Sequence, residues 1–219
     1  MRINEIFTGI DGEVNFMGQG TPSLFIRMQG CNMDPPCPYC DTPKSLNPKS
    51  GTEMTIREIK RHWLDIPEPR PKITITGGEP LFQEDELHEL LNALFPYSVK
   101  VSIETNGTLS LDRFRNVRKP NKDICLVVDL KLDQERKETT FRYLRDWDWV
   151  KMVIQNKSDF NVARGNLLWL RKIGCEARFA LSPAMGGDFA PAQLWEWMKA
   201  DGLFDVVLNV QLHRIIGLP

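Results

Sequence analysis

The stretch SLFIRMQGCNMDPPCPYCDTP, residues 23–43, joins an apolar run directly to a loop that holds three cysteines. Its first part, Leu24–Gln29, is short and mainly apolar, as expected for a strand that is buried on both faces of a parallel sheet. Further runs of this kind follow at Lys72–Thr76, Val99–Glu104, Ile124–Leu130, Trp149–Ile154, Glu176–Leu181 and Val206–Leu212. The sequence therefore repeats one unit, a buried strand that passes into a polar loop.

Amphipathic stretches between these runs predict helices. Thr55 and Glu58 form a capping-box pattern, which predicts a helix that ends near Trp63. Other helices are expected at Glu84–Leu94, from a cap at Ser158 to a stop at Gly174, and at Ala192–Ala200 with Pro191 in the first turn.

The alternation of strands and helices is typical of an α/β protein with right-handed crossovers. Because the strands are too few for a closed eight-stranded barrel, we expect a partial, open TIM-like (β/α) barrel of about six parallel strands with an N-terminal extension. A doubly wound sheet is the competing topology. No linker or low-complexity tract divides the chain, so residues 1–219 are expected to form a single domain.

Composition narrows the classes of partner. With 28 basic and 29 acidic residues the chain has a net charge of −1, which argues against bulk binding of nucleic acid. No apolar run has the length that crosses a bilayer, and the N-terminus lacks the apolar core of a signal peptide. We therefore expect a cytoplasmic protein without a nucleic-acid or membrane partner.

The cysteines are the first chemical signal. Cys31, Cys37 and Cys40 form a C-x5-C-x2-C arrangement, and cubane iron–sulfur clusters are held by cysteine thiolates, normally four of them. Three close cysteines without a clear fourth favour a cluster with one iron open to another ligand. A structural zinc site and a catalytic cysteine remain alternatives. The other two cysteines, Cys125 and Cys175, lie in or beside apolar strands and are expected to be buried small hydrophobic residues.

Polar and glycine residues collect where the predicted strands end, which is where βα barrels build their active sites. These segments are Thr76-Gly77-Gly78-Glu79-Pro80, Glu104-Thr105-Asn106-Gly107, Asp129-Leu130-Lys131, Ser182-Pro183 with Gly186 and Gly187, and Gln211-Leu212-His213. Any one of them alone would be read as a solvated loop. Their common position predicts a site at the carboxyl edge of the sheet.

The cysteine loop resembles that of radical S-adenosylmethionine enzymes, with Tyr39 in the aromatic position before the last cysteine. The resemblance implies a [4Fe–4S] cluster on Cys31, Cys37 and Cys40, with S-adenosylmethionine at the open iron. It also implies that the Gly-Gly-Glu-Pro turn binds the methionine part of this cofactor. The implied cofactor-binding residues are Gly78, Glu79, Asp129, Leu130, Lys131 and Ser182.

The longer first gap between cysteines is similar to one branch of that superfamily, the 7-carboxy-7-deazaguanine synthases. The similarity continues through NEIF, FIRMQGC, CDT, ITGGEP, IETNGT and QLHRIIGLP, so it covers nearly the whole chain. It implies that Arg27 pairs with the substrate carboxylate and that Thr42 offers a hydroxyl to Mg²⁺. The implied substrate-binding residues are Ile10, Asp11, Gly12, Arg27, Thr76, His213 and Pro219.

The segment Ile10-Asp11-Gly12-Glu13-Val14 departs from this branch, which usually has leucine-glutamine-glycine-glutamate-glycine there. Asp11 replaces an amide by a charge, and Val14 removes a flexible position. Without the resemblance, the segment would be read as a surface β-hairpin that turns at Asp11-Gly12.

The resemblance implies conversion of 6-carboxy-5,6,7,8-tetrahydropterin to 7-carboxy-7-deazaguanine with loss of ammonia. It also implies a homodimer and an external electron donor such as flavodoxin or ferredoxin. The alternatives are an activating enzyme for a glycyl-radical protein, which shares the Asp-x-Lys pattern, and a non-catalytic zinc-binding module.

Overall fold

The computed structural model describes residues 1–114, 123–184 and 189–218, which form an α/β fold around one nine-stranded sheet. The strand order is β3-β1-β2-β4-β5-β6-β7-β8-β9. The strands are β1 (Arg2–Asp11), β2 (Thr21–Met28), β3 (Thr52–Glu53), β4 (Lys72–Gly77), β5 (Val101–Thr105), β6 (Ile124–Asp129), β7 (Trp149–Ile154), β8 (Arg178–Pro183) and β9 (Val206–Leu208).

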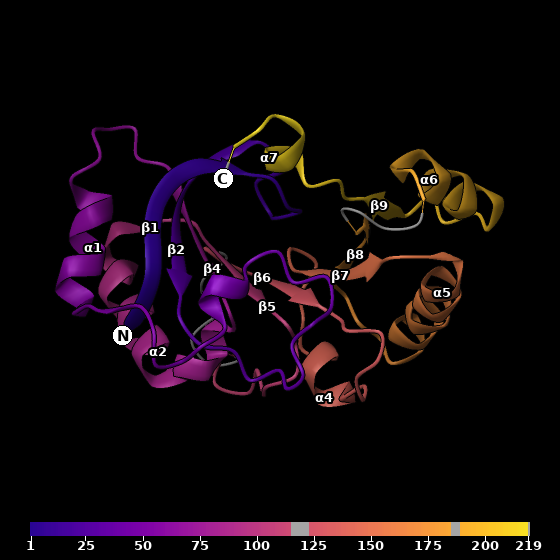
Figure 1. The fold of residues 1–219 in the computed structure, drawn as a ribbon, viewed down its shortest axis with the longest axis horizontal. Helices are drawn as coiled ribbons and strands as arrows, with labels where there is room; N and C mark the ends of the chain where they lie inside the picture. The colour runs from indigo at the N-terminus through magenta and orange to yellow at the C-terminus, as the bar shows by residue number, and fades with distance from the viewer. Residues whose placement is uncertain (115–122, 185–188, 219) are drawn as a thin grey trace.

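The strands from β2 to β9 in this order all pair in parallel, while β1 and β3 are antiparallel to their neighbours. The parallel strands follow one another in chain order, from β2 beside β1 to β9 at the far edge (Figure 1). A doubly wound sheet reverses its strand order at a switch point, and this sheet has no reversal. The partial, open barrel is therefore confirmed, and the doubly wound alternative is wrong.

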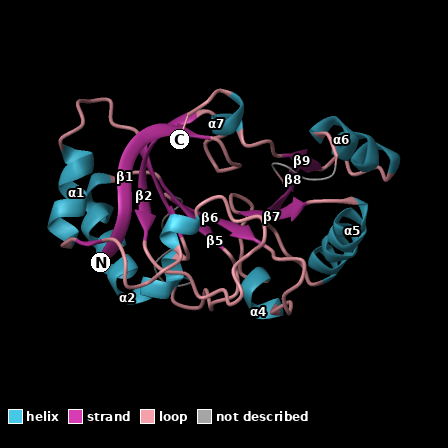
Figure 2. Ribbon diagram, in the orientation of Figure 1, coloured by secondary structure: helices cyan, strands magenta, loops and turns pink. Residues whose placement is uncertain are grey.

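Most helices lie around the outside of the sheet, as Figure 2 shows, and the short last helix lies on its open side. They are α1 (Ile56–Leu64), α2 (Glu84–Leu94), α4 (Glu138–Phe141), α5 (Lys157–Lys172), α6 (Pro191–Ala200) and α7 (Leu212–Ile215), and short 3-10 turns occur at Pro43–Ser45, Pro80–Gln83 and Phe95–Tyr97. The predicted capping box of Thr55 and Glu58 is confirmed at the start of α1, and Pro191 stands in the first turn of α6. Of the helices in the described ranges, none is long and apolar enough to span a bilayer.

One cap prediction is wrong. Helix α5 is capped by Asn156 and not by Ser158, because the Asn156 side chain accepts a hydrogen bond from the Asp159 backbone N–H at 3.0 Å. Ser158 lies exposed inside the first turn.

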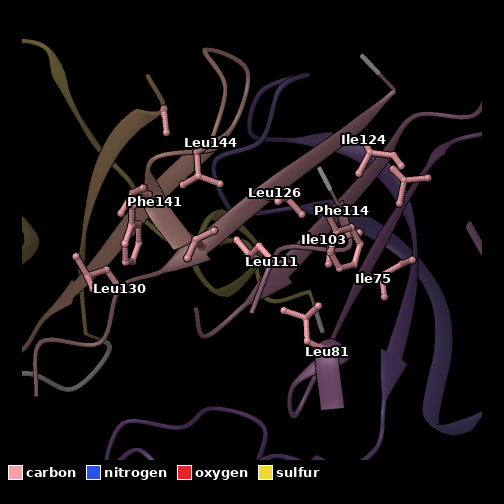
Figure 3. Close-up of a cluster of buried hydrophobic side chains, with 14 of the residues drawn as sticks. Ile75, Leu81, Ile103, Leu111, Phe114, Ile124, Leu126, Leu130, Phe141 and Leu144 are labelled. Carbon is pink, nitrogen blue, oxygen red and sulfur yellow. The ribbon is translucent and has the colours of Figure 1, made fainter. Parts of the chain in front are cut away.

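The main core fills the space between the sheet and the outer helices (Figure 3). Ile75, Ile103 and Leu126 come from three neighbouring strands and are buried in it. A second apolar cluster lies on the opposite face of β6, since successive strand residues point to opposite faces. It joins Cys125 and Val127 to Val14, which comes from the connection between β1 and β2. Val14 therefore closes the inner face of the open barrel.

The predicted N-terminal extension is part of the sheet and is not the surface hairpin that the segment suggests without the resemblance. It forms the ten-residue strand β1, which pairs with the whole length of β2. The chain turns across residues 12–20 and not at Asp11-Gly12, because Asp11 is itself paired with Thr21.

The last predicted strand is also shorter than expected. Strand β9 covers only Val206–Leu208 of the predicted run Val206–Leu212, and Leu212 begins α7. Asn209 directly follows the strand, and its side chain donates hydrogen bonds to Glu13 and Ser182.

Candidate active site

A cavity of about 460 Å³ opens at the carboxyl edge of the sheet, on the same face as Val127 and Val153. This volume lies within the range of small-molecule sites. The predicted site residues that line it are Asp11, Gly12, Arg27, Cys31, Cys37, Cys40, Thr42, Thr76, Gly78, Asp129, Lys131, Ser182 and His213. Ile10, Glu79 and Leu130 are not among the described lining residues, and Pro219 lies outside the described part of the chain.

Cys31, Cys37 and Cys40 are half-buried on one side of this cavity. The backbone holds the loop at both ends, since the Cys31 N–H donates to the Leu46 carbonyl at 3.1 Å and the Cys40 N–H to the Cys37 carbonyl at 3.0 Å. Burial raises the pKa of the Cys31 and Cys37 thiols, and the neighbouring cysteines raise it further. Three thiols that face one cavity are the donor set that suits a cubane cluster, in which each iron takes one cysteine.

A single metal ion fits this loop less well. Among the described residues, no three His, Cys, Asp or Glu side chains are placed to hold one ion. A cluster needs no such convergence, because its thiolates bind different irons.

The Gly77-Gly78 turn follows β4 and lies against the start of the cysteine loop. Gly77 has φ +140°, and a Cβ on Gly78 would lie 2.2 Å from the Gly30 carbonyl oxygen, so only glycine fits there. Glu79 is fully buried behind the turn and accepts hydrogen bonds from Leu81, Thr105 and Asn106. Burial raises the pKa of the Glu79 carboxyl despite these donors. In this structure Glu79 holds the turn in place and does not face the cavity.

Asp129 and Lys131 lie beside the cysteine loop. Lys131 Nζ is 2.8 Å from Asp129 Oδ2 and 5.1 Å from the centre of the Tyr39 ring. Burial opposes the charge on Lys131, but Asp129 and Tyr39 outweigh it and raise the pKa of the lysine. Asp129 Oδ1 is buried at the cavity wall and has no hydrogen-bond partner among the described residues. An unpaired buried acceptor is costly, so this atom marks a position where a ligand donor fits.

Five charged residues that line the cavity were given no role from the sequence: Glu13, Asp41, Glu104, Lys151 and Arg214. Lys151 Nζ pairs with Glu13 Oε2 at 3.0 Å. Glu104 is the penultimate residue of β5, and its pKa is raised to about 7 by burial and by the nearby charges of Asp11 and Glu13. The sequence could have indicated Lys151, because this lysine lies inside the apolar run Trp149–Ile154 and a buried lysine needs an acidic partner.

Arg27 projects from β2 at another side of the cavity. Its Nε donates to Glu5 Oε1 at 2.8 Å, and its guanidinium carbon lies 5.7 Å from the centre of the Phe7 ring. Among the described residues, the two Nη groups of Arg27 have no hydrogen-bond partner. They are therefore available to an anionic ligand in the cavity.

The two ends of the chain meet at the cavity. A Cβ on Gly12 would lie 2.0 Å from His213 Nδ1, so the two residues are in direct contact. Gln19 Nε2 lies within hydrogen-bond distance of the Gly12 and Val210 carbonyls, at 2.8 Å and 2.7 Å. Gln211 Nε2 donates to Glu13 Oε1 at 3.1 Å. The structure thus brings together Gly12 and His213, which the sequence could only place at opposite ends of the chain.

Known proteins resemble this chain over most of its length. Residues 25–189 match the model of the radical SAM superfamily. The chain is 34% identical to a 7-carboxy-7-deazaguanine synthase of Methanospirillum hungatei, over 100% of this chain and 86% of the relative. It is 35% identical to a protein of the same name from Clostridium acetobutylicum, over 100% of this chain and 96% of the relative.

A solved structure also shares the fold. Streptococcus suis SuiB bound to S-adenosylmethionine superposes with a TM-score of 0.58 at 16% identity, covering 83% of this chain and 45% of SuiB. These findings do not favour a zinc-binding module or a glycyl-radical activating enzyme. The chain belongs to the 7-carboxy-7-deazaguanine synthase family of the radical SAM superfamily, whose members carry a [4Fe–4S] cluster and S-adenosylmethionine.

Proposed function

We propose that this chain converts 6-carboxy-5,6,7,8-tetrahydropterin to 7-carboxy-7-deazaguanine and ammonia. The observation that carries the proposal is the shared cavity: the three cysteines, the free Nη groups of Arg27 and the paired ends of the chain all line it. When bound, the cluster and S-adenosylmethionine supply the hydrogen-atom abstraction that starts the ring contraction. The protein binds, orients and shields the substrate.

Each group of residues has a task in this proposal. Arg27 binds the substrate carboxylate through its two Nη groups. Glu13 and Glu104 offer acceptors to the N–H groups of the pterin ring, and Lys151 balances their charge. Asp129 Oδ1 accepts a hydrogen bond from S-adenosylmethionine, which removes the cost of leaving it unpaired.

Thr42 is the proposed ligand of a Mg²⁺ ion, a cation that prefers oxygen donors. Thr42 lines the cavity next to Asp41, and its side chain does not cap the short turn that follows it. Chelation of Mg²⁺ should slow product formation, and Thr42→Ala should raise the Mg²⁺ concentration at which the rate is half-maximal.

The iron and sulfide content of the purified protein tests the cluster assignment. Protein purified and reconstituted without oxygen should contain about four iron and four sulfide ions per chain. Alanine at Cys31, Cys37 or Cys40 should abolish this content, whereas Cys175→Ala, outside the cavity, should keep it. A wild-type protein without iron would contradict the cluster assignment.

The substrate is tested by anaerobic turnover with S-adenosylmethionine, a reductant, Mg²⁺ and 6-carboxy-5,6,7,8-tetrahydropterin, with products identified by mass spectrometry. Arg27→Ala should lower kcat/KM by at least about a hundredfold, because a half-buried charged hydrogen-bond partner is lost. The matched control is Arg142→Ala, which removes an exposed ion pair with Glu138. Cleavage of S-adenosylmethionine without any deazapurine product would overturn the proposed substrate.

Two further parts of the proposal concern partners. An external one-electron donor such as flavodoxin or ferredoxin reduces the cluster, and the protein acts as a homodimer. Sedimentation of the reconstituted protein tests the second point, and a purely monomeric species at working concentration would contradict it.

A further inference from the structure

Lys72 and Asp11 form an ion pair directly behind the cavity. Lys72 begins β4 and Asp11 ends β1, and their side chains are 0% and 1% exposed. Lys72 Nζ lies 2.5 Å from Asp11 Oδ2, 2.7 Å from Thr74 Oγ1 and 3.2 Å from Ser102 Oγ. All three donors of the ammonium group thus have an acceptor, as a buried cation requires.

Asp11 connects this ion pair to the turn at Gly12-Glu13, which lines the cavity. Its Oδ1 accepts a hydrogen bond from the Glu13 backbone N–H at 3.0 Å, and its Oδ2 accepts from Thr74 Oγ1 at 3.0 Å. The Asp11 side chain therefore holds the turn at Gly12 in the shape that packs Gly12 on His213 and points Glu13 at Lys151.

The ion pair of Lys72 with Asp11 also contributes to the net charge around the cavity. Glu13, Glu104 and Asp11 are three carboxyl groups at the cavity wall, and Lys151 is the cation paired with the first of them. Without Lys72, the Asp11 carboxylate would be buried without a counter-ion next to the other two. An anionic substrate would then enter a more negative cavity.

We propose that Lys72 is a positioning residue of the substrate site. It neutralises Asp11 and, through Asp11, holds the Gly12-Glu13 turn in the form that accepts a small carboxylated ligand. The inference rests on the proposed function for the identity of that ligand, while the coupling of Lys72 to Asp11 does not depend on it.

The coupling is tested first by urea unfolding of the full chain. Lys72→Met removes the charge at similar length and should lower the urea midpoint, because Asp11 stays buried and unpaired. The double variant Lys72→Met with Asp11→Asn should recover about half of that loss or more. If Lys72→Met does not fold but the double variant does, the coupling is shown in the same way. A double variant as unstable as, or less stable than, Lys72→Met would overturn it.

The positioning role is tested by kinetics under the anaerobic conditions given above. Lys72→Met should raise KM for the carboxytetrahydropterin by about tenfold or more, and the double variant should have a KM at least about threefold lower than that of Lys72→Met. Cleavage of S-adenosylmethionine without pterin should stay within about twofold, since Lys72 does not reach the cofactor residues. The matched control is Lys100→Met, because Lys100 pairs with Asp123 away from the cavity.

The outcomes separate the two proposals. An unchanged KM in Lys72→Met, or a double variant with the same raised KM, would overturn the positioning role. If wild-type protein forms no product, the proposed function fails, and the unfolding experiment still decides whether Lys72 and Asp11 are coupled.

Discussion

At the scale of single residues, Glu104 has a charge that responds to pH near neutrality. Burial comes first among the causes, followed by the negative charges of Asp11 and Glu13, and together they raise its pKa from 4.5 to about 7. The folded protein therefore binds a proton on Glu104 over a pH range in which the unfolded chain has released it. Linkage then requires that stability falls as pH rises from 4.5 through 7.

Glu104→Gln should remove this pH dependence. At pH 8 the variant should be more stable than wild type by about 3 kcal/mol, because an unfavourable buried charge is gone. At pH 4 the difference should vanish, since the wild-type carboxyl is then protonated in both states. Urea unfolding at the two pH values measures this, with Glu89→Gln on the exposed side of α2 as the control. Equal differences at both pH values would contradict the raised pKa.

Asp11 shows at the same scale how one departure from a family pattern is accommodated. The family usually has glutamine at this position, so Asp11 brings a negative charge in place of an amide. In the structure this charge pairs with Lys72, and both side chains are buried. Val14 likewise replaces a glycine and packs on Cys125 and Val127 inside the barrel. The structure therefore accommodates Asp11 through its ion pair with Lys72 and Val14 through apolar packing.

At the scale of elements, the start of α5 depends on a reciprocal cap. Asn156 Oδ1 accepts from the Asp159 N–H at 3.0 Å, and Asp159 Oδ2 accepts from the Gln155 N–H at 2.9 Å. Each helix begins with backbone N–H groups that lack a partner within the helix, and this cap satisfies one of them while tying down the preceding residue.

Asn156→Ala should accordingly lower the free energy of unfolding by about 1 kcal/mol. Ser158→Ala, only two residues away but inside the exposed first turn, should change it by less than about 0.5 kcal/mol. Chemical unfolding of the two variants measures the difference. The reverse order would show that Ser158 is the cap.

At the scale of the whole molecule, the contact of Gly12 with His213 joins the first strand to the last helix. Figure 1 shows α7 lying next to the end of β1, on the open side of the sheet. The backbone N–H of Leu212 also donates to the Gly12 carbonyl at 3.3 Å. The cavity is thus closed by segments that are about two hundred residues apart in the sequence.

Gly12→Ala should open this contact, because the added Cβ would lie 2.0 Å from His213 Nδ1 and 2.8 Å from its backbone nitrogen. We expect faster amide hydrogen exchange at residues 209–218 and a kcat/KM lower by about tenfold or more. Gly165→Ala on α5 is the matched control, since its Cβ meets nothing within 4 Å and alanine favours the helix. Unchanged exchange in Gly12→Ala would contradict the proposed closure.

Much of the architecture follows from local sequence. The apolar runs predicted the parallel strands to within a few residues, because a strand buried on both faces must be apolar at successive positions. The common position of polar residues after these strands predicted one edge of the sheet as the site, since parallel strands all end on the same side. The resemblance in the cysteine loop supplied the cofactor class.

Other features were decided only in the tertiary structure. Strand β1 contains both polar and apolar residues, most of them half-exposed. Its strand conformation therefore depends on backbone pairing with β2. Glu79 carries a polar side chain at the site, but its direction follows from hydrogen bonds to Thr105, which ends β5, and to Asn106, which follows it. Lys72 is paired through space with a residue of another strand, and no local pattern encodes that meeting. Local sequence determines which side chains are apolar and which are polar. The partner of a buried charge depends instead on which distant segments pack together in the tertiary structure.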